Sequence, residues 1–330
     1  MKRIAVLCPG RGSYTDKSLR SFPTGHPWLQ RADELRAEYM LPALSKLDGA
    51  DTFDKKEHLR AANVSPLIWL TTMLDAASAR ENAKLVCVAG NSLGWYSALA
   101  VAGALDFDDG FRLVQEMALM QEQHVGGGQL IYPIVDDEWR PDEDRKRIVE
   151  DALASSGGEA LLSIALGGFL VLAGSDAGMK HLMRELPAAQ LGKNRYPFKL
   201  LGHGPYHTPF VAEVADKARA LLGKLEWRTP EVTLVDGRGV RFTPWSTDLD
   251  ALRDYTLGPQ VTTPYDFTAS VRVTLREFAP DELVLPGPGN TLGAICGQVL
   301  CAEGWRGVHS KGEFESLQAS DAPIVYSMRR

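Results

Sequence analysis

A serine that could act as a nucleophile lies at position 92, within residues 90–94, Gly-Asn-Ser-Leu-Gly. This G-x-S-x-G pattern is typical of a sharp strand-to-helix turn, in which small flanking residues let the two elements approach and the serine backbone is strained. The helix N-terminus then stabilises negative charge beside the serine oxygen. An apolar run at 85–89 precedes the motif and a helix-like run at 95–100 follows it. The pattern therefore predicts Ser92 as a catalytic nucleophile.

A serine nucleophile needs a base, which is usually a histidine. His207 lies in residues 202–210, a stretch rich in glycine and proline that would hold a side chain in a fixed place. His203 is the rival in the same stretch. In an ordinary α/β hydrolase the order along the chain is serine, acid, histidine, which would select the late His309 instead. The residues alone leave these three alternatives open.

Several elements must position these side chains. Apolar runs at 4–8, 85–89 and 283–285 each end in a glycine-rich turn, which is typical of buried parallel strands. Helices are expected at 66–79, with Ser65 as its cap and Pro66 at its first position, and at 111–122 and 265–278. The sequence thus predicts an α/β fold with a parallel sheet.

The middle of the chain follows a different pattern. Its expected order is strand, helix, strand, strand, helix, strand, which is the ferredoxin-like pattern. The corresponding residues are 130–135, 143–155, 161–164, 169–173, 177–185 and 196–200. We predict a core made of residues 1–127 and 201–330, interrupted by a subdomain at 128–200. The residues after Glu303 show no clear pattern.

Composition narrows the class of protein. The 330 residues carry a formal charge of −6, with 45% hydrophobic and 24% charged residues, which indicates an ordinary globular chain and argues against nucleic-acid binding. The four cysteines form no CxxC pair, which suits a reducing cytoplasm. No apolar run of membrane-spanning length, secretory leader, metal-ligand cluster or nucleotide-binding glycine motif is present. We expect a cytoplasmic protein that binds no membrane, metal or nucleic acid.

Six short segments together resemble one family, the malonyl-CoA:acyl carrier protein transacylases and the related acyltransferase domains of polyketide synthases. They occur in the family's order and cover about residues 4–300. The matching segments are 9–13 (PGRGS), 63–66 (NVSP), 90–99 (GNSLGWYSAL), 102–107 (AGALDF), 204–209 (GPYHTP) and 287–292 (GPGNTL). The resemblance implies a hydrolase-like three-layer α/β core with an inserted ferredoxin-like subdomain.

The resemblance also implies a function, namely ping-pong acyl transfer in fatty acid or polyketide biosynthesis. Ser92 would attack an acyl-CoA thioester, His207 would accept the proton, and the backbone N–H groups of Leu93 and Arg11 would form the oxyanion hole. The acyl group would then pass to the phosphopantetheine of an acyl carrier protein. No bound cofactor is implied, because acyl-CoA and phosphopantetheine are substrates. A hydrolase that clears acyl groups from carrier proteins is the alternative within the same fold.

The chain departs from the family at the acyl pocket. Malonyl-specific members have an arginine in the helix after the nucleophile turn, where guanidinium pairs with the malonyl carboxylate. Here that position holds Glu116, or Met117 with a different gap. Ser65 and Asp266 stand where the family usually has glutamine, and the strand around Ser163 lacks the family's asparagines. The acyl pocket is therefore expected at Glu116, Met117, Ser65, Ser163 and Asp266.

Three interpretations follow for the acyl group. In the first, the acyl group lacks a free carboxylate or is a non-standard extender. In the second, the protein is an acyl hydrolase. In the third, it is a malonyl enzyme in which the cation that binds the carboxylate has moved, with Arg11 as the candidate.

An acidic carrier protein would need a local basic face. Two such faces are Lys193, Arg195 and Lys199, and Lys55, Lys56 and Arg60.

Overall fold

The computed structural model describes residues 1–124 and 126–329. The α-helices are α1 (Pro27–Glu38), α2 (Leu44–Asp48), α3 (Lys55–His58), α4 (Ala61–Arg80), α5 (Gly94–Val101), α6 (Phe107–Gln123), α7 (Glu143–Ala154), α8 (Asp176–Glu185), α9 (Ala212–Leu222), α10 (Leu249–Leu257), α11 (Pro259–Thr262), α12 (Phe267–Phe278), α13 (Gly293–Ala302) and α14 (Lys311–Gln318). The β-strands are β1 (Lys2–Cys8), β2 (Ala83–Gly90), β3 (Gly128–Pro133), β4 (Ala160–Leu166), β5 (Phe169–Gly174), β6 (Ala189–Leu191), β7 (Asn194–Tyr196), β8 (Phe198–Leu200), β9 (Leu234–Val235), β10 (Arg241–Phe242), β11 (Tyr265–Asp266), β12 (Glu282–Leu285) and β13 (Val325–Ser327).

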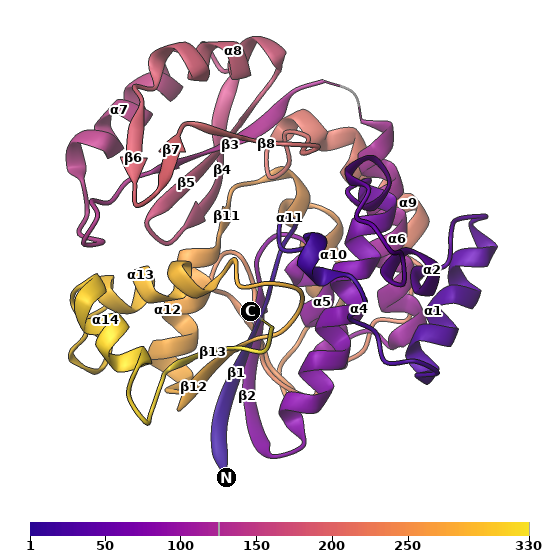
Figure 1. The fold of residues 1–330 in the computed structure, drawn as a ribbon. Helices are drawn as coiled ribbons and strands as arrows, with labels where there is room; N and C mark the ends of the chain where they lie inside the picture. Colours follow the sequence, from indigo (N-terminus) through magenta and orange to yellow (C-terminus); the bar gives the residue numbers. More distant parts are fainter. Residues whose placement is uncertain (125, 330) are drawn as a thin grey trace.

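The larger sheet forms the middle layer of the core and has the order β10-β9-β2-β1-β12-β13. Its pairs are parallel except for β9 with β10. The central strand β1 is buried from Ile4 to Cys8, because helices cover both faces of the sheet. Helices α4 and α5 lie on one side of it and α12 and α13 on the other (Figure 1). The predicted three-layer α/β core is confirmed.

The smaller sheet has the order β11-β4-β5-β3-β8, and from β4 to β8 each strand is antiparallel to its neighbour. Together with α7 and α8, which cover its outer face (Figure 1), these four strands make the ferredoxin-like arrangement expected from the sequence. One strand comes from outside residues 128–200, because β11 pairs in parallel with β4. The boundaries at 127/128 and 200/201 stay a prediction.

Helix α4 begins earlier than the sequence indicates. Proline at a first helical position predicts a start at Pro66, but the helix begins at Ala61 and Pro66 lies inside it. An internal proline has no N–H to donate to the carbonyl four residues earlier, here that of Ala62. Gln115 Nε2 donates to this oxygen at 3.2 Å, and the guanidinium of Arg36 also donates to it. Side chains from two neighbouring helices therefore replace the missing backbone bond, and the helix continues.

Two further segments differ from the sequence-based prediction. The segment expected as one helix at 265–278 opens with the two-residue strand β11, and only Phe267 onward is helical. The patternless tail contains α14 and β13, which extends the larger sheet by pairing with β12. None of the helices in the described part of the chain is long and apolar enough to cross a membrane.

Candidate active site

The turn between β2 and α5 holds Ser92 in a strained conformation, with a φ of 54°. The two glycines of the motif are required by close packing. A Cβ atom at Gly90 would lie 2.1 Å from the carbonyl oxygen of Gly94, and one at Gly94 would lie 2.1 Å from that of Cys8. Small residues at these positions therefore let the strand, the turn and the helix pass close to β1, as the sequence pattern predicts.

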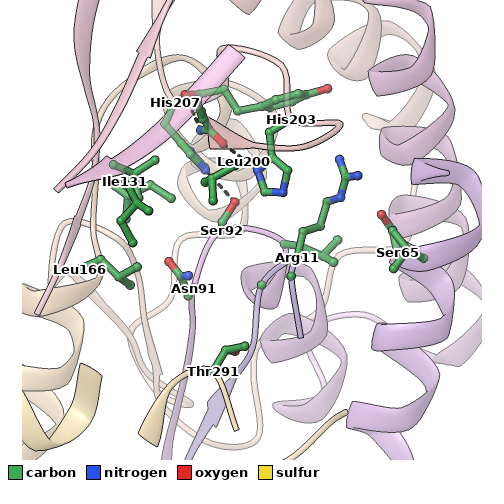
Figure 2. Close-up of a pocket in the computed structure, with 18 of the residues that line it drawn as sticks. Arg11, Ser65, Asn91, Ser92, Ile131, Leu166, Leu200, His203, His207 and Thr291 are labelled. Carbon is green, nitrogen blue, oxygen red and sulfur yellow. Dashed lines mark hydrogen bonds between the residues drawn. The ribbon is translucent and has the colours of Figure 1, made fainter. Parts of the chain in front are cut away.

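His207 lies directly beside the serine. Its Nε2 is 2.8 Å from the Oγ of Ser92, and its Nδ1 is 2.7 Å from the backbone carbonyl oxygen of Gln260 in α11 (Figure 2). The backbone N–H of His207 also donates to the carbonyl of Val261 at 2.8 Å. Because the carbonyl accepts from Nδ1–H, the Nε2 lone pair faces the serine hydroxyl. The pair has the geometry of a nucleophile and its general base.

The other two histidines do not contact Ser92. His203 lines the same cavity, and its Nδ1 is 2.9 Å from Oε1 of Gln129. His309 is exposed on the C-terminal segment, where its backbone N–H donates to Glu313. The structure thus brings Ser92 together with His207 and not with either alternative.

Gln260 is a site residue that the sequence reasoning missed. Its side-chain Nε2 donates to the carbonyl oxygen of Ser92 at 3.2 Å, and its Oε1 accepts from the hydroxyl of Tyr96 at 3.0 Å. Its backbone carbonyl orients His207. Asp266 is the residue that the resemblance places at a position where the family usually has glutamine, but Gln260, six residues earlier, is the glutamine in contact with the pair. A glutamine so close to the expected position is the signal that could have indicated it.

Burial lowers the pKa of His207 to about 4, and the hydrogen bond to the Gln260 carbonyl opposes this shift. Since only the neutral imidazole can accept the serine proton, the rate of Ser92 acylation should fall only as pH decreases through about 4. An exposed histidine would titrate near 6.5. We expect a flat profile between about pH 7 and about pH 5, measured as CoA release per enzyme over a pH series. An inflection near 6.5, with the fold intact by circular dichroism, would contradict this expectation.

The backbone of Arg11 lies next to the nucleophile turn. A Cβ at the preceding Gly10 would lie 2.7 Å from the carbonyl oxygen of Asn91, so glycine is needed for this approach. Leu93 and Arg11 both line the cavity that contains Ser92. Their proposed use as oxyanion-hole donors stays a prediction, and their placement is compatible with it.

A cavity of about 550 Å³ surrounds the pair and lies between the core and the smaller sheet. Of the five residues expected to form the acyl pocket, Ser65 of α4 and Met117 of α6 line it. Among the lining residues that the structure describes, Arg11 is the only lysine, arginine, aspartate or glutamate. Its Nη1 donates to the carbonyl of Gly202 at 3.0 Å, and burial lowers its pKa to about 10.

The other three residues lie outside the lining. Glu116 is absent from the lining because adjacent helix positions differ by about 100°, and its carboxylate lies near Tyr39 instead. Ser163 is the bulge residue of β4, and its Oγ donates to the Tyr206 carbonyl at 2.9 Å behind the His207 loop. Asp266 caps α12 by accepting from the backbone of Ala269. The prediction that these three line the pocket does not match the structure.

The fold and the nucleophile turn define a protein of the α/β hydrolase-like class with an inserted ferredoxin-like subdomain. No family model matches the chain. It is 28% identical to the malonyl CoA-acyl carrier protein transacylase of Mycobacterium tuberculosis over 327 residues, 95% of this chain and 99% of that protein. It is 26% identical to the Escherichia coli K12 protein of the same name, over 91% of this chain and 94% of that one.

Solved structures with the same fold include a type II PKS acyl carrier protein in complex with its malonyl transacylase. Its TM-score is 0.76 at 19% identity, with 99% of this chain and 96% of that chain covered. The malonyl-CoA:ACP transacylase of Synechocystis sp. PCC 6803 has a TM-score of 0.75 at 19% identity, with 100% and 97% covered. Over nearly its whole length the chain is thus similar in sequence and in fold to malonyl-CoA:acyl carrier protein transacylases.

Proposed function

We propose that this protein is an acyl-CoA:acyl carrier protein S-acyltransferase that works through an acyl ester on Ser92, in fatty acid or polyketide biosynthesis. The observation that carries the proposal is the 2.8 Å contact between Ser92 Oγ and His207 Nε2 at the base of a large cavity. The family relatives are named for malonyl transfer to acyl carrier protein, which agrees with this reaction class.

The first half-reaction forms the acyl-enzyme. The Oγ of Ser92 attacks the thioester carbonyl while His207 Nε2 accepts the hydroxyl proton, and the N–H groups of Leu93 and Arg11 stabilise the oxyanion. The C–S bond then breaks, and CoA leaves as the thiol after taking the proton from His207. In the second half-reaction the carrier-protein thiol attacks the ester, His207 accepts the thiol proton, and that proton returns to Ser92.

The experiment that tests the proposal is intact mass spectrometry of the protein after incubation with acyl-CoA. We expect an acyl adduct on the wild-type chain, absent from Ser92→Ala, which disappears when a phosphopantetheinylated carrier protein is added and reappears on that carrier. No adduct with any acyl-CoA would refute the proposal. Loss of the adduct to water as fast as to the carrier would favour the acyl hydrolase instead.

The finer question of a malonyl substrate turns on Arg11. Glu116 faces away from the cavity and Met117 carries no charge, so any acyl carboxylate that enters would meet the Arg11 guanidinium. We expect Arg11→Ala to reduce Ser92 loading from malonyl-CoA at least about tenfold relative to loading from acetyl-CoA, since a bidentate ion pair would be lost. The ratio of the two loading rates is the measurement, because it cancels effects on the oxyanion hole. An unchanged ratio would exclude Arg11 as the relocated cation.

A further inference from the structure

The inner face of the smaller sheet forms one wall of the cavity. Side chains alternate between the two faces of a strand, and α7 and α8 cover the outer face. The strand pairing places four apolar side chains in one row across β8, β3, β5 and β4, and two more lie in the next row. We call these six the apolar wall: Phe198, Ile131, Val171 and Ile164, then Leu166 and Phe169.

The apolar wall is continuous with the nucleophile. Ile131 and Leu166 lie on one side of Ser92 in Figure 2, and Arg11 and Ser65 lie on the other. Neighbouring strands are about 4.8 Å apart, so a row across four strands is about 14 Å long. A chain attached to Ser92 could therefore lie along this wall.

The composition of the apolar wall determines which part of an acyl-CoA it can bind. A pantetheine arm brings two amides, and burying an amide without a hydrogen-bond partner is unfavourable. The six side chains of the apolar wall contain no nitrogen or oxygen atom. Gln129 of β3 lies beside the wall, but its amide already hydrogen-bonds Ser163, Tyr206 and His203. Other polar lining groups lie away from the wall, on Arg11, Ser65 of α4 and Gln121 of α6. The arm of CoA is thus better accommodated on the Arg11 side, which leaves the wall for hydrocarbon.

We infer that the acyl group handled by Ser92 carries a hydrocarbon chain of medium length, which lies against the apolar wall. This inference rests on the proposed acyl transfer. A malonyl or acetyl group would leave the wall uncovered, whereas each added methylene would bury apolar surface and increase the rate of loading by severalfold.

The first measurement is the second-order rate constant for Ser92 loading from acetyl-, butyryl-, hexanoyl- and octanoyl-CoA, followed by CoA release. We expect the rate constant to increase at least tenfold from acetyl to hexanoyl. These four substrates lack a carboxylate, so the comparison is independent of Arg11. Equal rate constants, or a decrease with chain length, would overturn the inference.

The second measurement uses a variant that fills the wall. Val171 lies inside the row between Ile131 and Ile164, so Val171→Phe should lower the octanoyl-to-acetyl ratio of rate constants at least tenfold. Ile131→Phe serves as a second variant, because Ile131 is only half-buried and can accept a ring with little strain. Val240→Phe, at a valine that is 42% exposed and outside the cavity, is the matched control and should keep the wild-type ratio.

The outcomes separate the two proposals. If no acyl-CoA loads Ser92, the proposed acyl transfer fails and the wall has no substrate. Suppose instead that the acetyl group of acetyl-CoA loads Ser92 and passes to the carrier, but the octanoyl-to-acetyl ratio of rate constants is near one in the wild type and in both wall variants. In that case only the inference about the hydrocarbon chain fails.

Discussion

Replacing His207 with alanine is expected to slow the acylation of Ser92 about 10²–10⁴-fold, the usual contribution of a positioned general base. The imidazole is the group within hydrogen-bonding distance of the Ser92 hydroxyl that can take its proton, at 2.8 Å. The cavity and the backbone of the nucleophile turn should remain, so substrate binding is expected to change far less than the rate. Single-turnover CoA release at saturating acyl-CoA measures the effect.

The chain offers a matched histidine control. His309→Ala should leave the acylation rate within about twofold of wild type, because surface changes away from a site have small effects and His309 is exposed on the C-terminal segment. A plain esterase with the order serine, acid, histidine would give the opposite result. Loss of activity in His309→Ala with retention in His207→Ala would contradict the assignment of the base.

The sequence was most informative where local geometry restricts residue type. The two glycines of the G-x-S-x-G motif are required because a Cβ atom at either position would lie about 2 Å from a backbone carbonyl oxygen. The motif therefore predicts the tight turn. His207 was indicated by the glycine- and proline-rich loop that fixes its backbone. The ferredoxin-like subdomain followed from the order of its predicted strands and helices.

The sequence was least informative about features that depend on contacts with residues distant in the chain. Whether Glu116 or Met117 faces the cavity depends on the rotation of α6 about its axis. An alignment that is uncertain by one residue does not decide between them. Gln260 acts through its backbone carbonyl as well as its side chain, and a carbonyl leaves no signal in residue type. The start of α4 could not be predicted because Pro66 is tolerated only through side chains of Arg36 and Gln115, which are remote in sequence.

Arg36 is accordingly expected to be essential for stability. It is fully buried, burial lowers its pKa to about 10, and its guanidinium donates only to uncharged oxygens. These are the carbonyls of Pro42 and Ala62, Oε1 of Gln115 and Oδ1 of Asn63. Arg36→Met would remove the guanidinium donor from all four acceptors, and only the Ala62 carbonyl would keep another donor, Gln115 Nε2. We therefore expect unfolding to become easier by about 3–5 kcal/mol. Calorimetry should show a melting temperature lower by about 5–10 °C.

Two further variants distinguish the proposed cause from loss of volume or charge. Arg147→Met, at an exposed arginine paired with Asp144, should change stability by less than about 0.5 kcal/mol. Pro66→Ala restores an N–H that can donate to the Ala62 carbonyl, so Arg36→Met should cost about 1 kcal/mol less in that background. If Arg36→Met lowers stability by the same amount with proline and with alanine at position 66, Arg36 does not substitute for the missing backbone bond.

Because α4 and α6 carry Ser65 and Met117 into the cavity, a loosened Arg36 network should also broaden the acyl-chain preference. That coupling links the proline in α4, through one buried cation, to the shape of the substrate pocket.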